Sequence, residues 1–594
     1  MPTFRSVLVA NRGEIALRVF RTARRMGLQC IAVYSEADRN ARHVREADAA
    51  HCIGRAAPRE SYLSIDSIIA AARATGAEAV HPGYGFLAEN AGFAQAVLDA
   101  GLVWIGPSPE AICAMGDKAN AKRLAHTAGV PVLESFDPAG QVEYPIMIKA
   151  VAGGGGRGMR LVRTKEELAA LLASAKSEAL ASFGDDRVIL ERAVESPRHI
   201  EVQLLADTHG NIVHLGERDC SVQRRHQKLI EETPSPAVDA NFRARLGEAA
   251  IKVARSVGYS GAGTVECLVD ARGNFWFMEM NTRLQVEHPV TEEVTGLDLV
   301  EWQLRVAAGE KLAFGQDDLG FSGHSIEARL CAEDPAQGFL PQSGTIALWQ
   351  APAGVRVEHA LESGTEIAPH YDSMIAKVIA HAPTRDAARE KLACALDRCV
   401  ALGVPNNAAY LAAVLRDGVF ARGEATTALL AERFSEWKAP VPDEKILGIA
   451  RTLYAASCAQ AAGFGEWACW SNSRPSPMPV PEIAHARDGR SIHFLLEGAS
   501  WTWRDSSMDP PERAALGAAD GRLVAPMNGK VAQVAVKAGD SVAAGAPLMV
   551  LEAMKMEHTL SAPVALQVKA VHAAQGAQVS PGQLLVEFDP AGKA

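Results

Sequence analysis

The C-terminal part of the sequence contains an imperfect duplication in which equivalent residues lie 37 positions apart. Ala525-Pro526 recurs as Ala562-Pro563, and the same offset relates Gly539/Gly576, Gly545/Gly582, Leu548/Leu585, Val531/Val568, Val534/Val571 and Val542/Val579. Two similar copies of this composition predict a small closed structure of paired β-strands. Lys555 falls at the junction of the copies, where we expect an exposed hairpin tip. A lysine held in this way suits the carriage of a covalently attached group between sites.

The residues around this lysine, Ala553-Met554-Lys555-Met556, resemble the biotinylation motif of biotin carboxyl carrier domains. The related lipoyl carrier domains usually place their lysine between an acidic and a small residue, so the flanking methionines favour biotin. The alternative is an ordinary surface lysine on a β-sandwich, and the duplication favours the carrier. The resemblance implies that a biotin protein ligase attaches biotin to Lys555. It also implies that residues 520–590 form an all-β biotinyl domain of the barrel-sandwich type.

The bulk composition limits the class of protein. With 594 residues, the chain is too long for one hydrophobic core, and we expect three to five domains. A net charge of −10 gives no electrostatic reason to expect nucleic acid or an anionic membrane as a partner. No apolar run is long enough to span a bilayer, and the strand-like Val7 to Ala10 lies close to the N-terminus. We therefore expect a mature cytoplasmic protein, and its scattered cysteines predict free thiols.

Strands and helices alternate in the first hundred residues. Ser6 to Ala10 is predicted as a strand, Ile15 to Met26 as a helix and Cys30 to Tyr34 as the next strand. This βαβ order predicts a parallel sheet with helices on both faces. The loop Asn11-Arg12-Gly13-Glu14 lacks the Gly-x-Gly-x-x-Gly pattern, which argues against a dinucleotide site.

A glycine-rich run follows the strand-like segment Ile146 to Lys149, and it comprises Gly153, Gly154, Gly155, Gly156, Arg157 and Gly158. Glycines let backbone amides approach phosphate oxygens without a Cβ clash, and Lys149 adds a positive charge. A flexible loop of the same composition is the alternative. Because the run lies within a small unit of about residues 131–206, we interpret it as a lid over a nucleotide.

Two carboxylates lie in strand-like apolar segments farther along the chain. Glu266 and Glu279, together with Asn281, offer the hard oxygen ligands that Mg²⁺ or Mn²⁺ would use to bridge ATP phosphates. The alternative is a pair of solvent-facing glutamates on amphipathic strands. The neighbours of Glu279, from Phe275 to Met280, are nearly all apolar, so this alternative suits Glu279 poorly.

Three polar residues alternate directly after Asn281, and these are Arg283, Gln285 and Glu287. In an extended segment, alternate side chains point to the same face. Such a face would bind a small anion through Arg283 and present Glu287 as a base.

From residue 4 to about residue 436, the motifs resemble those of the biotin carboxylase branch of the ATP-grasp family, in family order. They comprise His81 to Leu87, Met115 to Lys118, the glycine-rich run, Arg224 to Lys228, Glu279 to Glu287, Arg329 to Pro335 and Tyr371 to Met374. The implied fold is multidomain α/β. An N-terminal parallel α/β domain (1–115) precedes an ATP-grasp domain (116–320) with the glycine-rich lid. A C-terminal α+β carboxylase domain (321–438) and a short helix/β linker domain (439–515) follow.

The resemblance also implies a role for each matching residue. ATP and other cofactor contacts fall to Lys118, Lys149, Glu191, His199, His226 and the lid glycines. The metal ligands are Glu266, Glu279 and Asn281. Bicarbonate is bound by Lys228, Arg283, Gln285 and Val286. Glu287 is the general base, Arg329 stabilises the enolate-like form of biotin, and Tyr84 and Asp372 lie near the biotin ring.

The implied reaction begins when Glu287 removes a proton from bicarbonate, which then attacks the γ-phosphate of ATP. The metal ion, Lys149 and Lys228 offset the negative charge, while the lid excludes water. Carboxyphosphate breaks down to CO₂ and phosphate, and the phosphate takes the N1′ proton of biotin. Arg329 stabilises the resulting anion, which attacks CO₂. Tethering the biotin to the chain gives it a high effective concentration.

Two alternative functions, another ATP-grasp ligase and an inactive carrier, agree less well with the sequence. Another ATP-grasp ligase, such as a carbamoyl phosphate synthetase-like enzyme, would not need the carrier lysine. An inactive carrier or scaffold would predict losses among the site residues, yet all are present, namely Lys228, Glu279, Arg283, Glu287 and Arg329.

The segment between Trp437 and Leu523 is too short for a carboxyltransferase, so the resemblance implies a separate β subunit that binds acyl-CoA. An α6β6-type hetero-oligomer is expected.

In the linker, Asp443 is predicted to cap a helix with an apolar stripe, and short strands are expected at Ile492 to Leu496 and Trp501 to Trp503. The shortness of this linker argues against a propionyl-CoA type. We therefore expect the α subunit of an acyl-CoA carboxylase for 3-methylcrotonyl-CoA, then geranyl-CoA, with propionyl-CoA and acetyl-CoA as further alternatives.

Overall fold

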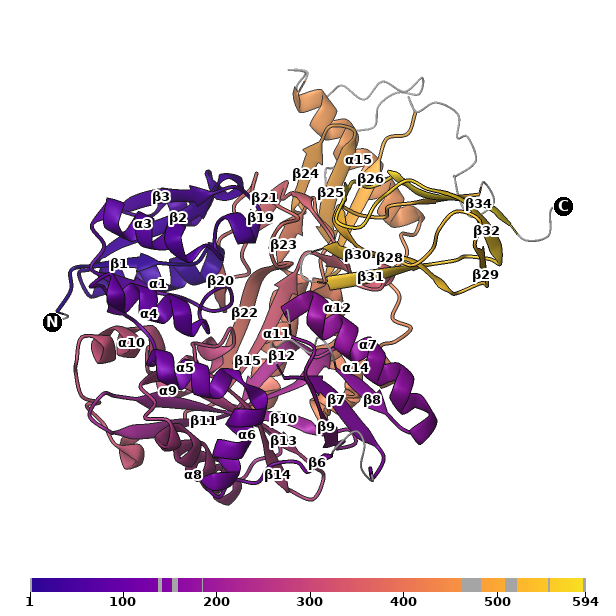
Figure 1. The fold of residues 1–594 in the computed structure, drawn as a ribbon. Helices are drawn as coiled ribbons and strands as arrows, with labels where there is room; N and C mark the ends of the chain where they lie inside the picture. Colours follow the sequence, from indigo (N-terminus) through magenta and orange to yellow (C-terminus); the bar gives the residue numbers. More distant parts are fainter. Residues whose placement is uncertain are drawn as a thin grey trace.

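The computed structural model describes residues 3–136, 142–151, 159–183, 185–461, 482–507, 521–553 and 556–590. The predicted lid glycines at 153–158 and the predicted carrier lysine, Lys555, lie outside these ranges. Figure 1 shows an N-terminal α/β unit, a large central sheet, a smaller lid unit and two C-terminal units. Within the described ranges, none of the helices has the length and apolarity needed to cross a membrane.

The N-terminal unit is a five-stranded parallel sheet in the order β3-β2-β1-β4-β5, as predicted from the βαβ pattern. Its strands are β1 (Ser6–Val9), β2 (Gln29–Ser35), β3 (Ala49–Gly54), β4 (Ala79–His81) and β5 (Val103–Trp104). Its helices are α1 (Gly13–Arg25), α2 (Arg42–Arg45), α3 (Ile65–Thr75), α4 (Ala91–Asp99) and α5 (Pro109–Gly116). At the end of β1, the Asn11 amide donates to the carbonyls of Pro82 and Tyr84, at 2.9 and 2.8 Å. These bonds fix the loop that carries Tyr84.

The centre of the molecule is an eight-stranded antiparallel sheet in the order β14-β13-β10-β11-β12-β15-β22-β20. The strands are β10 (Arg198–Ala206), β11 (Ile212–Arg224), β12 (Gln227–Thr233), β13 (Gly261–Val269), β14 (Phe275–Asn281), β15 (His324–Cys331), β20 (Arg356–His359) and β22 (Met374–Ala382). Because β15 pairs with β12, the sheet runs across the predicted domain boundary at residue 320. The two predicted domains on either side of residue 320 therefore share one sheet.

Helices cover both faces of this sheet (Figure 1), since α8 (Ala240–Ser256) packs on Leu204 of β10 and α10 (Leu299–Ala307) on Leu205 of the same strand. The other helices of this part of the chain are α6 (Lys118–Thr127), α9 (His288–Thr295), α11 (Arg385–Asp397), α12 (Ala408–Arg416), α13 (Gly418–Ala421) and α14 (Leu429–Arg433). Short antiparallel pairs complete the region, formed by β16 (Glu333–Asp334) with β17 (Leu340–Pro341), β18 (Gly344–Thr345) with β21 (Glu366–Ile367), and β19 (Leu348–Gln350) with β23 (Val400–Leu402).

The lid unit is a four-stranded antiparallel sheet in the order β6-β9-β7-β8, covered by one helix. Its elements are β6 (Ser135–Phe136), β7 (Ile146–Ala150), β8 (Arg160–Val162), α7 (Lys165–Phe183) and β9 (Val188–Arg192). The predicted lid range extends to residue 206 and so includes β10. In the structure, however, β10 pairs with β11 and β13 in the central sheet. The lid sheet therefore ends with β9.

The linker consists of one helix and a three-stranded antiparallel sheet, as far as its described residues show. These elements are α15 (Glu444–Ala461), β24 (His485–Asp488), β25 (Ser491–Leu496) and β26 (Ala499–Arg504). The Asp443 carboxylate accepts a bond of 2.8 Å from the backbone N–H of Ile446, so the predicted cap is confirmed. Leu453 of the predicted apolar stripe is buried against Ile492 and Phe494, which joins the helix to the sheet.

The C-terminal domain consists of two four-stranded sheets, in the orders β27-β34-β32-β29 and β31-β30-β28-β33. The strands are β27 (Arg522–Val524), β28 (Gly529–Val534), β29 (Ser541–Val542), β30 (Pro547–Ala553), β31 (Met556–Ser561), β32 (Leu566–Val571), β33 (Gln578–Val579) and β34 (Leu584–Pro590). The repeated glycines Gly539, Gly576, Gly545 and Gly582 have φ values of +93°, +87°, +82° and +80°. The duplication thus repeats left-handed turns as well as strands, which confirms the predicted β-sandwich.

Candidate active site

The candidate active site is built around Lys228 on β12, whose ammonium group contacts three carboxylates. The Nζ atom lies 2.5 Å from Oε2 of Glu201, 2.9 Å from Oε1 of Glu266 and 2.7 Å from Oε1 of Glu287. All three glutamates are buried. Burial alone would lower the pKa of Lys228, but the charges of Glu201, Glu266 and Glu287 hold it well above its usual value. Lys228 is therefore a fixed positive charge at the centre of the site.

Glu287 lies between two cations at the start of α9. Its Oε1 accepts from Lys228, and its Oε2 accepts from the guanidinium of Arg329 at 2.9 Å. Burial would raise the pKa of Glu287, but the charges of Lys228, Arg329 and Arg218 hold it well below its usual value. Glu287 is thus ionised at neutral pH, which is the protonation state that a general base requires.

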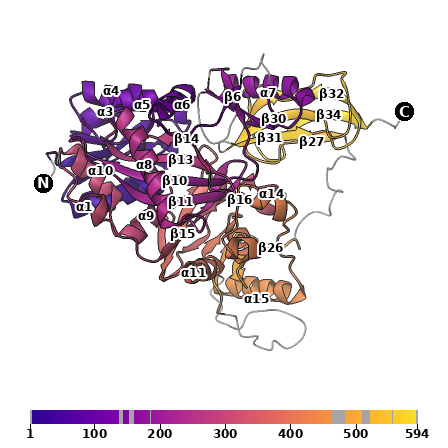
Figure 2. The same cartoon turned by 90° about the horizontal axis from the view of Figure 1, so that it is seen from below.

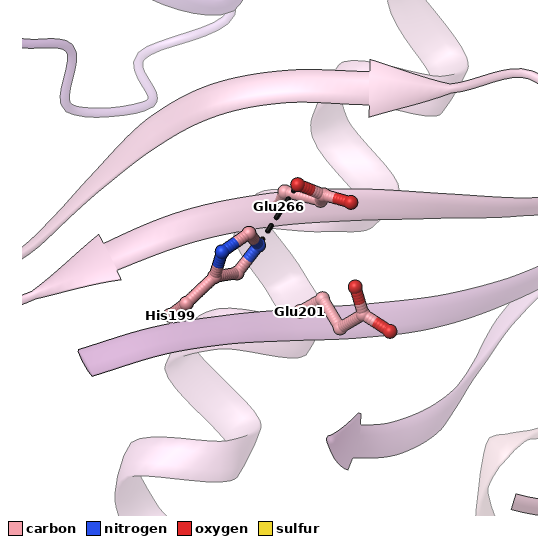
Figure 3. A group of neighbouring side chains, drawn as sticks. All are labelled: His199, Glu201 and Glu266. Carbon is pink, nitrogen blue, oxygen red and sulfur yellow. Dashed lines mark ion pairs between the residues drawn. The ribbon is translucent and has the colours of Figure 1, made fainter. Parts of the chain in front are cut away.

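Figure 3 shows that His199 and Glu201 of β10 and Glu266 of β13 point toward one another. Their ligand atoms lie close enough together to hold a metal ion, and Nε2 of His199 is 2.8 Å from Oε2 of Glu266. The ammonium group of Lys228 donates to both Glu201 and Glu266, so a positive charge already occupies the space between these carboxylates. We therefore interpret this group as part of the ion-pair network of the site.

The three predicted metal ligands lie together on β13 and β14. Glu266 and Glu279 are paired residues in the two strands, and the amide of Asn281 donates to Oε1 of Glu266 at 2.8 Å. Glu279 also lies 3.5 Å from Nζ of Lys118 on α6. Two carboxylates and an amide oxygen make up a donor set that suits a hard divalent cation. The residues therefore fit the predicted metal ion.

The predicted anion-binding residues are also adjacent, but their polar groups are already bonded to other protein groups. Arg283 donates to Glu89, Gln285 and Asn281, at 2.8, 3.0 and 3.1 Å. Gln285 in turn donates to Oε1 of Glu266 at 3.0 Å. An arriving anion would exchange with these contacts. The carbonyl of Val286 accepts from Nζ of Lys377 at 2.7 Å, which fixes the backbone next to Glu287.

The predicted ATP residues of the lid lie around Glu191 on β9. This buried carboxylate pairs with Lys149 of β7 at 2.9 Å and with Lys122 of α6. Burial would raise the pKa of Glu191, but Lys149 and Lys122 together lower it. His226, in the turn between β11 and β12, has its pKa lowered by partial burial and then by the charges of Lys149 and His199. The charges of Lys149 and His199, both predicted to bind ATP, thus act on this turn.

Tyr84 and Asp372, both predicted to lie near biotin, occupy different surroundings. The Tyr84 hydroxyl donates to the carboxylate of Glu14, and Lys377 contacts the same carboxylate at 3.2 Å. Burial and then the negative charge of Glu14 raise the pKa of Tyr84 well above its usual value. Asp372 is exposed and accepts a bond of 3.0 Å from the backbone N–H of Met374 at the start of β22.

Some of the residues at this site were not identified from the sequence. They are Glu14, Lys122, Glu201, Arg218, Glu231, Glu327 and Lys377, and nearly all are fully or almost fully buried. A charged residue within a strand-like apolar segment was the signal that could have revealed several of them, such as Glu201 in Ile200-Glu201-Val202. No sequence motif links Lys122 on α6 with Glu191 on β9, since only the tertiary fold brings them together.

Behind Arg329, a pair of buried carboxyl groups lacks the usual number of partners. Glu231 and Glu327 are opposite each other in β12 and β15, and Oε1 of Glu231 accepts from Arg329 at 2.6 Å. Among the described residues, the other three carboxylate oxygens have no hydrogen-bond partner. Burial raises the pKa of Glu231 to about 7 and holds the pKa of Glu327 well above its usual value. The pair therefore holds a proton at neutral pH.

Replacing Glu327 by Gln should make the protein more stable at high pH. A carboxyl group whose folded pKa is raised loses stability as pH rises above its unfolded value, and glutamine has no such dependence. The thermal midpoint of Glu327→Gln minus that of the wild type should therefore increase from pH 5 to pH 8, by the equivalent of about 1 kcal/mol or more. The exposed Glu497→Gln serves as the control and should show no such trend. A flat difference for Glu327→Gln would contradict a shared proton.

Comparison with known families matches four segments of the chain. Residues 3–112 match "Biotin carboxylase, N-terminal domain" and residues 116–314 match "Carbamoyl-phosphate synthase L chain, ATP binding domain". Residues 327–432 match "Biotin carboxylase C-terminal domain", and residues 521–588 match "Biotin-requiring enzyme". Together these segments cover the carboxylase and the C-terminal β domain.

Two curated relatives extend over nearly the whole chain. The chain is 40% identical to the mitochondrial methylcrotonoyl-CoA carboxylase subunit alpha of Rattus norvegicus, over 98% of this chain and 93% of the relative. It is 39% identical to the propionyl-CoA carboxylase alpha chain of Ruegeria pomeroyi, over 99% of this chain and 100% of the relative.

A similar solved structure is the biotin carboxylase domain of Hydrogenobacter thermophilus 2-oxoglutarate carboxylase, in complex with MgADP, ADP and bicarbonate. This domain is 46% identical to the chain. It has a TM-score of 0.72 and covers 74% of this chain and 99% of that domain.

Proposed function

This chain belongs to the biotin-dependent carboxylases, as an alpha subunit with a biotin carboxylase and a biotinyl domain, and we propose that it carboxylates biotin attached to its own Lys555. The carboxylase is an ATP-dependent ligase. The observation that supports the proposal most directly is the position of Glu287, an ionised carboxylate between Lys228 and Arg329. A base and two anion-binding cations at one point suit the activation of bicarbonate.

At this site, Glu287 would accept the proton of bicarbonate while Lys228 and Arg283 bind the anion. When bicarbonate takes over part of the contact with Lys228, Glu287 loses some of the positive charge that lowers its pKa, so its basicity increases. Bicarbonate oxygen would then attack the γ-phosphorus of ATP, and ADP would leave. Arg329, fixed by Glu231 at 2.6 Å, would offset the negative charge that develops on the carboxyl acceptor.

We propose that Glu266, Glu279 and Asn281 hold Mg²⁺ or Mn²⁺ against the ATP phosphates. Such an ion, when bound, supplies positive charge that offsets the charge of the phosphates being separated. The Hydrogenobacter domain is a structure with MgADP and bicarbonate, which supports a magnesium ion with the nucleotide in this carboxylase. Lys118, Lys149, His199 and His226 would bind the nucleotide together with the lid glycines, and Glu191 would align Lys149.

We further propose that the carboxyl group passes from the biotinyl domain to an acyl-CoA on a separate β subunit, in an α6β6-type assembly. 3-Methylcrotonyl-CoA is our first choice of acyl substrate, since the rat relative is the alpha subunit of a methylcrotonoyl-CoA carboxylase. The Ruegeria relative, a propionyl-CoA carboxylase alpha chain of similar identity, moves propionyl-CoA ahead of geranyl-CoA as the second candidate, despite the short linker. Mixing the chain with each candidate β subunit and measuring acyl-CoA-dependent ADP release would distinguish the two.

The carboxylase function is tested by bicarbonate-dependent ADP release with free biotin, together with the intact mass of the chain. We expect biotin-stimulated ADP release and one biotin adduct, which Lys555→Ala removes without reducing turnover of free biotin. The reason is that Lys555 supplies only the attachment point. A correctly folded chain that binds ATP but shows no biotin-stimulated release, alone or with a β subunit, would contradict the proposal.

A further inference from the structure

The C-terminal domain lies against the carboxylase. In Figure 1 this domain overlaps the linker, but Figure 2, turned by 90°, shows the two apart, with the C-terminal domain beside α7. Leu340 of β17 is 7% exposed and belongs to the hydrophobic cluster of the C-terminal domain, which also contains Met527. Within the described ranges, that cluster includes no residue of the linker. A polar contact lies nearby, since the amide of Asn528 donates to Oγ of Ser343 at 3.3 Å.

The hairpin that presents Leu340 is held rigidly by the carboxylase. The guanidinium of Arg224 lies 4.1 Å from the centre of the Phe339 ring and 3.1 Å from the carboxylate of Glu333. The Phe339 ring also packs edge-on against Tyr410, at 4.9 Å between centres. Phe339 has a φ of +64°, a backbone conformation that costs a bulky residue about 1–3 kcal/mol and that persists only where the surroundings enforce it. The next residue, Leu340, is thereby held toward the C-terminal domain.

The orientation of the docked domain brings the strand after the carrier lysine close to the active site. His558 lies on β31, three residues after Lys555. Burial and then the charges of Arg225 and Arg224 lower the pKa of His558, so the turn between β11 and β12 lies close to it. The same turn leads directly into Lys228 on β12. The docked domain therefore presents His558 of β31 to this turn.

The contact is incompletely packed, which suits a reversible complex. A cavity of about 160 Å³ remains between the two domains. On the carboxylase it is lined by Pro341, Gln342, Ser343 and Pro369, and on the C-terminal domain by Pro526, Met527, Asn528 and Pro581. A closely packed interface would hold the two domains together more strongly. Because this cavity is not filled, the C-terminal domain can dissociate from the carboxylase more easily.

We propose that residues 339–343, which we call the docking loop, form the surface on which the biotinyl domain of the same chain docks during carboxylation, with Leu340 as its apolar anchor. This inference rests on the proposed function, because it assigns the place where the tethered substrate is delivered. The docking loop lies outside the ion-pair network around Lys228, so binding of the carrier and the chemistry at Glu287 are separable.

The test compares two reactions of the biotinylated full-length chain. Leu340→Asp would place an unpaired charge in the apolar contact. It should lower the single-turnover rate of radiolabelled bicarbonate transfer to the chain by about tenfold or more, the effect of losing one buried leucine contact. Biotin-stimulated ADP release with free biotin should stay within about twofold, because free biotin needs no docking. An unchanged transfer rate would overturn the docking proposal, whereas absence of free-biotin turnover in the wild type would contradict the proposed function itself.

A second readout needs no activity. In Lys555→Ala, which carries no biotin, we expect the backbone amides of the docking loop to be protected from hydrogen exchange, and Leu340→Asp in that background to remove the protection. Val564→Glu is the matched control, since Val564 is an apolar residue of the same domain that is 39% exposed. It should change neither the transfer rate nor the exchange. Equal protection with and without Leu340→Asp would overturn the proposal.

A mixing experiment distinguishes docking within one chain from docking between chains. Biotinylated Leu340→Asp would be mixed with Lys555→Ala, whose docking loop is intact but which carries no biotin. The proposal predicts that transfer to the biotinylated chain remains slow. Recovery of the wild-type rate would show that a second copy supplies the docking surface, and it would overturn docking within the same chain.

Discussion

Glu287→Gln should reduce bicarbonate-dependent ADP release by a factor of about 100 or more, the usual contribution of a general base. Glutamine keeps nearly the same shape, but it cannot accept the bicarbonate proton. In the wild type, the two oxygens of Glu287 accept from Lys228 and Arg329. In the variant, the amide NH₂ would replace one of these oxygens and would place a donor against one of the two cations. The loss should therefore appear in kcat at saturating bicarbonate. The measurement is steady-state ADP release with free biotin across a range of bicarbonate concentrations.

A matched change at the surface separates this effect from a general loss of charge. Glu248→Gln removes an exposed carboxylate that pairs with Lys252 within α8, and it should leave kcat unchanged. Glu287→Gln should also keep its affinity for ATP, because the nucleotide residues on the lid and on α6 do not contact Glu287. A variant that retains more than about a tenth of wild-type kcat would exclude Glu287 as the base.

The sequence predicted the parts of the fold that depend on local pattern. The 37-residue repeat carries valines on its strands and glycines at left-handed turns, so the C-terminal β-sandwich could be recognised before any contact was known. The βαβ order likewise predicted the parallel sheet of the N-terminal unit. The sharing of one sheet across residue 320 could not be predicted this way. Pairing of β12 with β15 joins strands about 90 residues apart, and no short pattern encodes it.

The same distinction holds for the active site. The alternation of Arg283, Gln285 and Glu287 predicted a common face in an extended segment, but the chain bends at Arg283 and turns at Val286 and Glu287. Contacts with Glu266 and Lys228 instead bring Gln285 and Glu287 together. The partners that set their charge come from distant strands and helices. Glu201 reaches Lys228 from β10, and Lys377 reaches the Val286 carbonyl from β22. Each of these contacts depends on strand order in the central sheet, which propensity and spacing do not determine.

The largest effect on stability is expected from Lys228→Met. Methionine has a similar length but no charge, so Glu201, Glu266 and Glu287 would lose the cation that they share. Removing one partner from buried ion pairs typically costs about 3–5 kcal/mol. At pH 8 we expect the carboxylase to unfold at a markedly lower temperature or urea concentration than the wild type, and bicarbonate-dependent turnover to be lost with the anion-binding charge.

The pH dependence of this loss identifies its cause. In the wild type, the lowered pKa values of Glu266 and Glu287 contribute stability that is present above the unfolded value of about 4.3 and is lost only as pH falls through the folded values. In Lys228→Met, the crowded carboxylates should have raised folded pKa values, so the folded variant binds protons and gains stability as pH falls from 8 to 5. The difference between wild type and variant should therefore shrink over that range. Lys252→Met, at an exposed pair, is the control and should show a small difference at every pH. A loss in Lys228→Met that is equally large at pH 5 and pH 8 would contradict an electrostatic origin and would instead indicate a packing defect at β12.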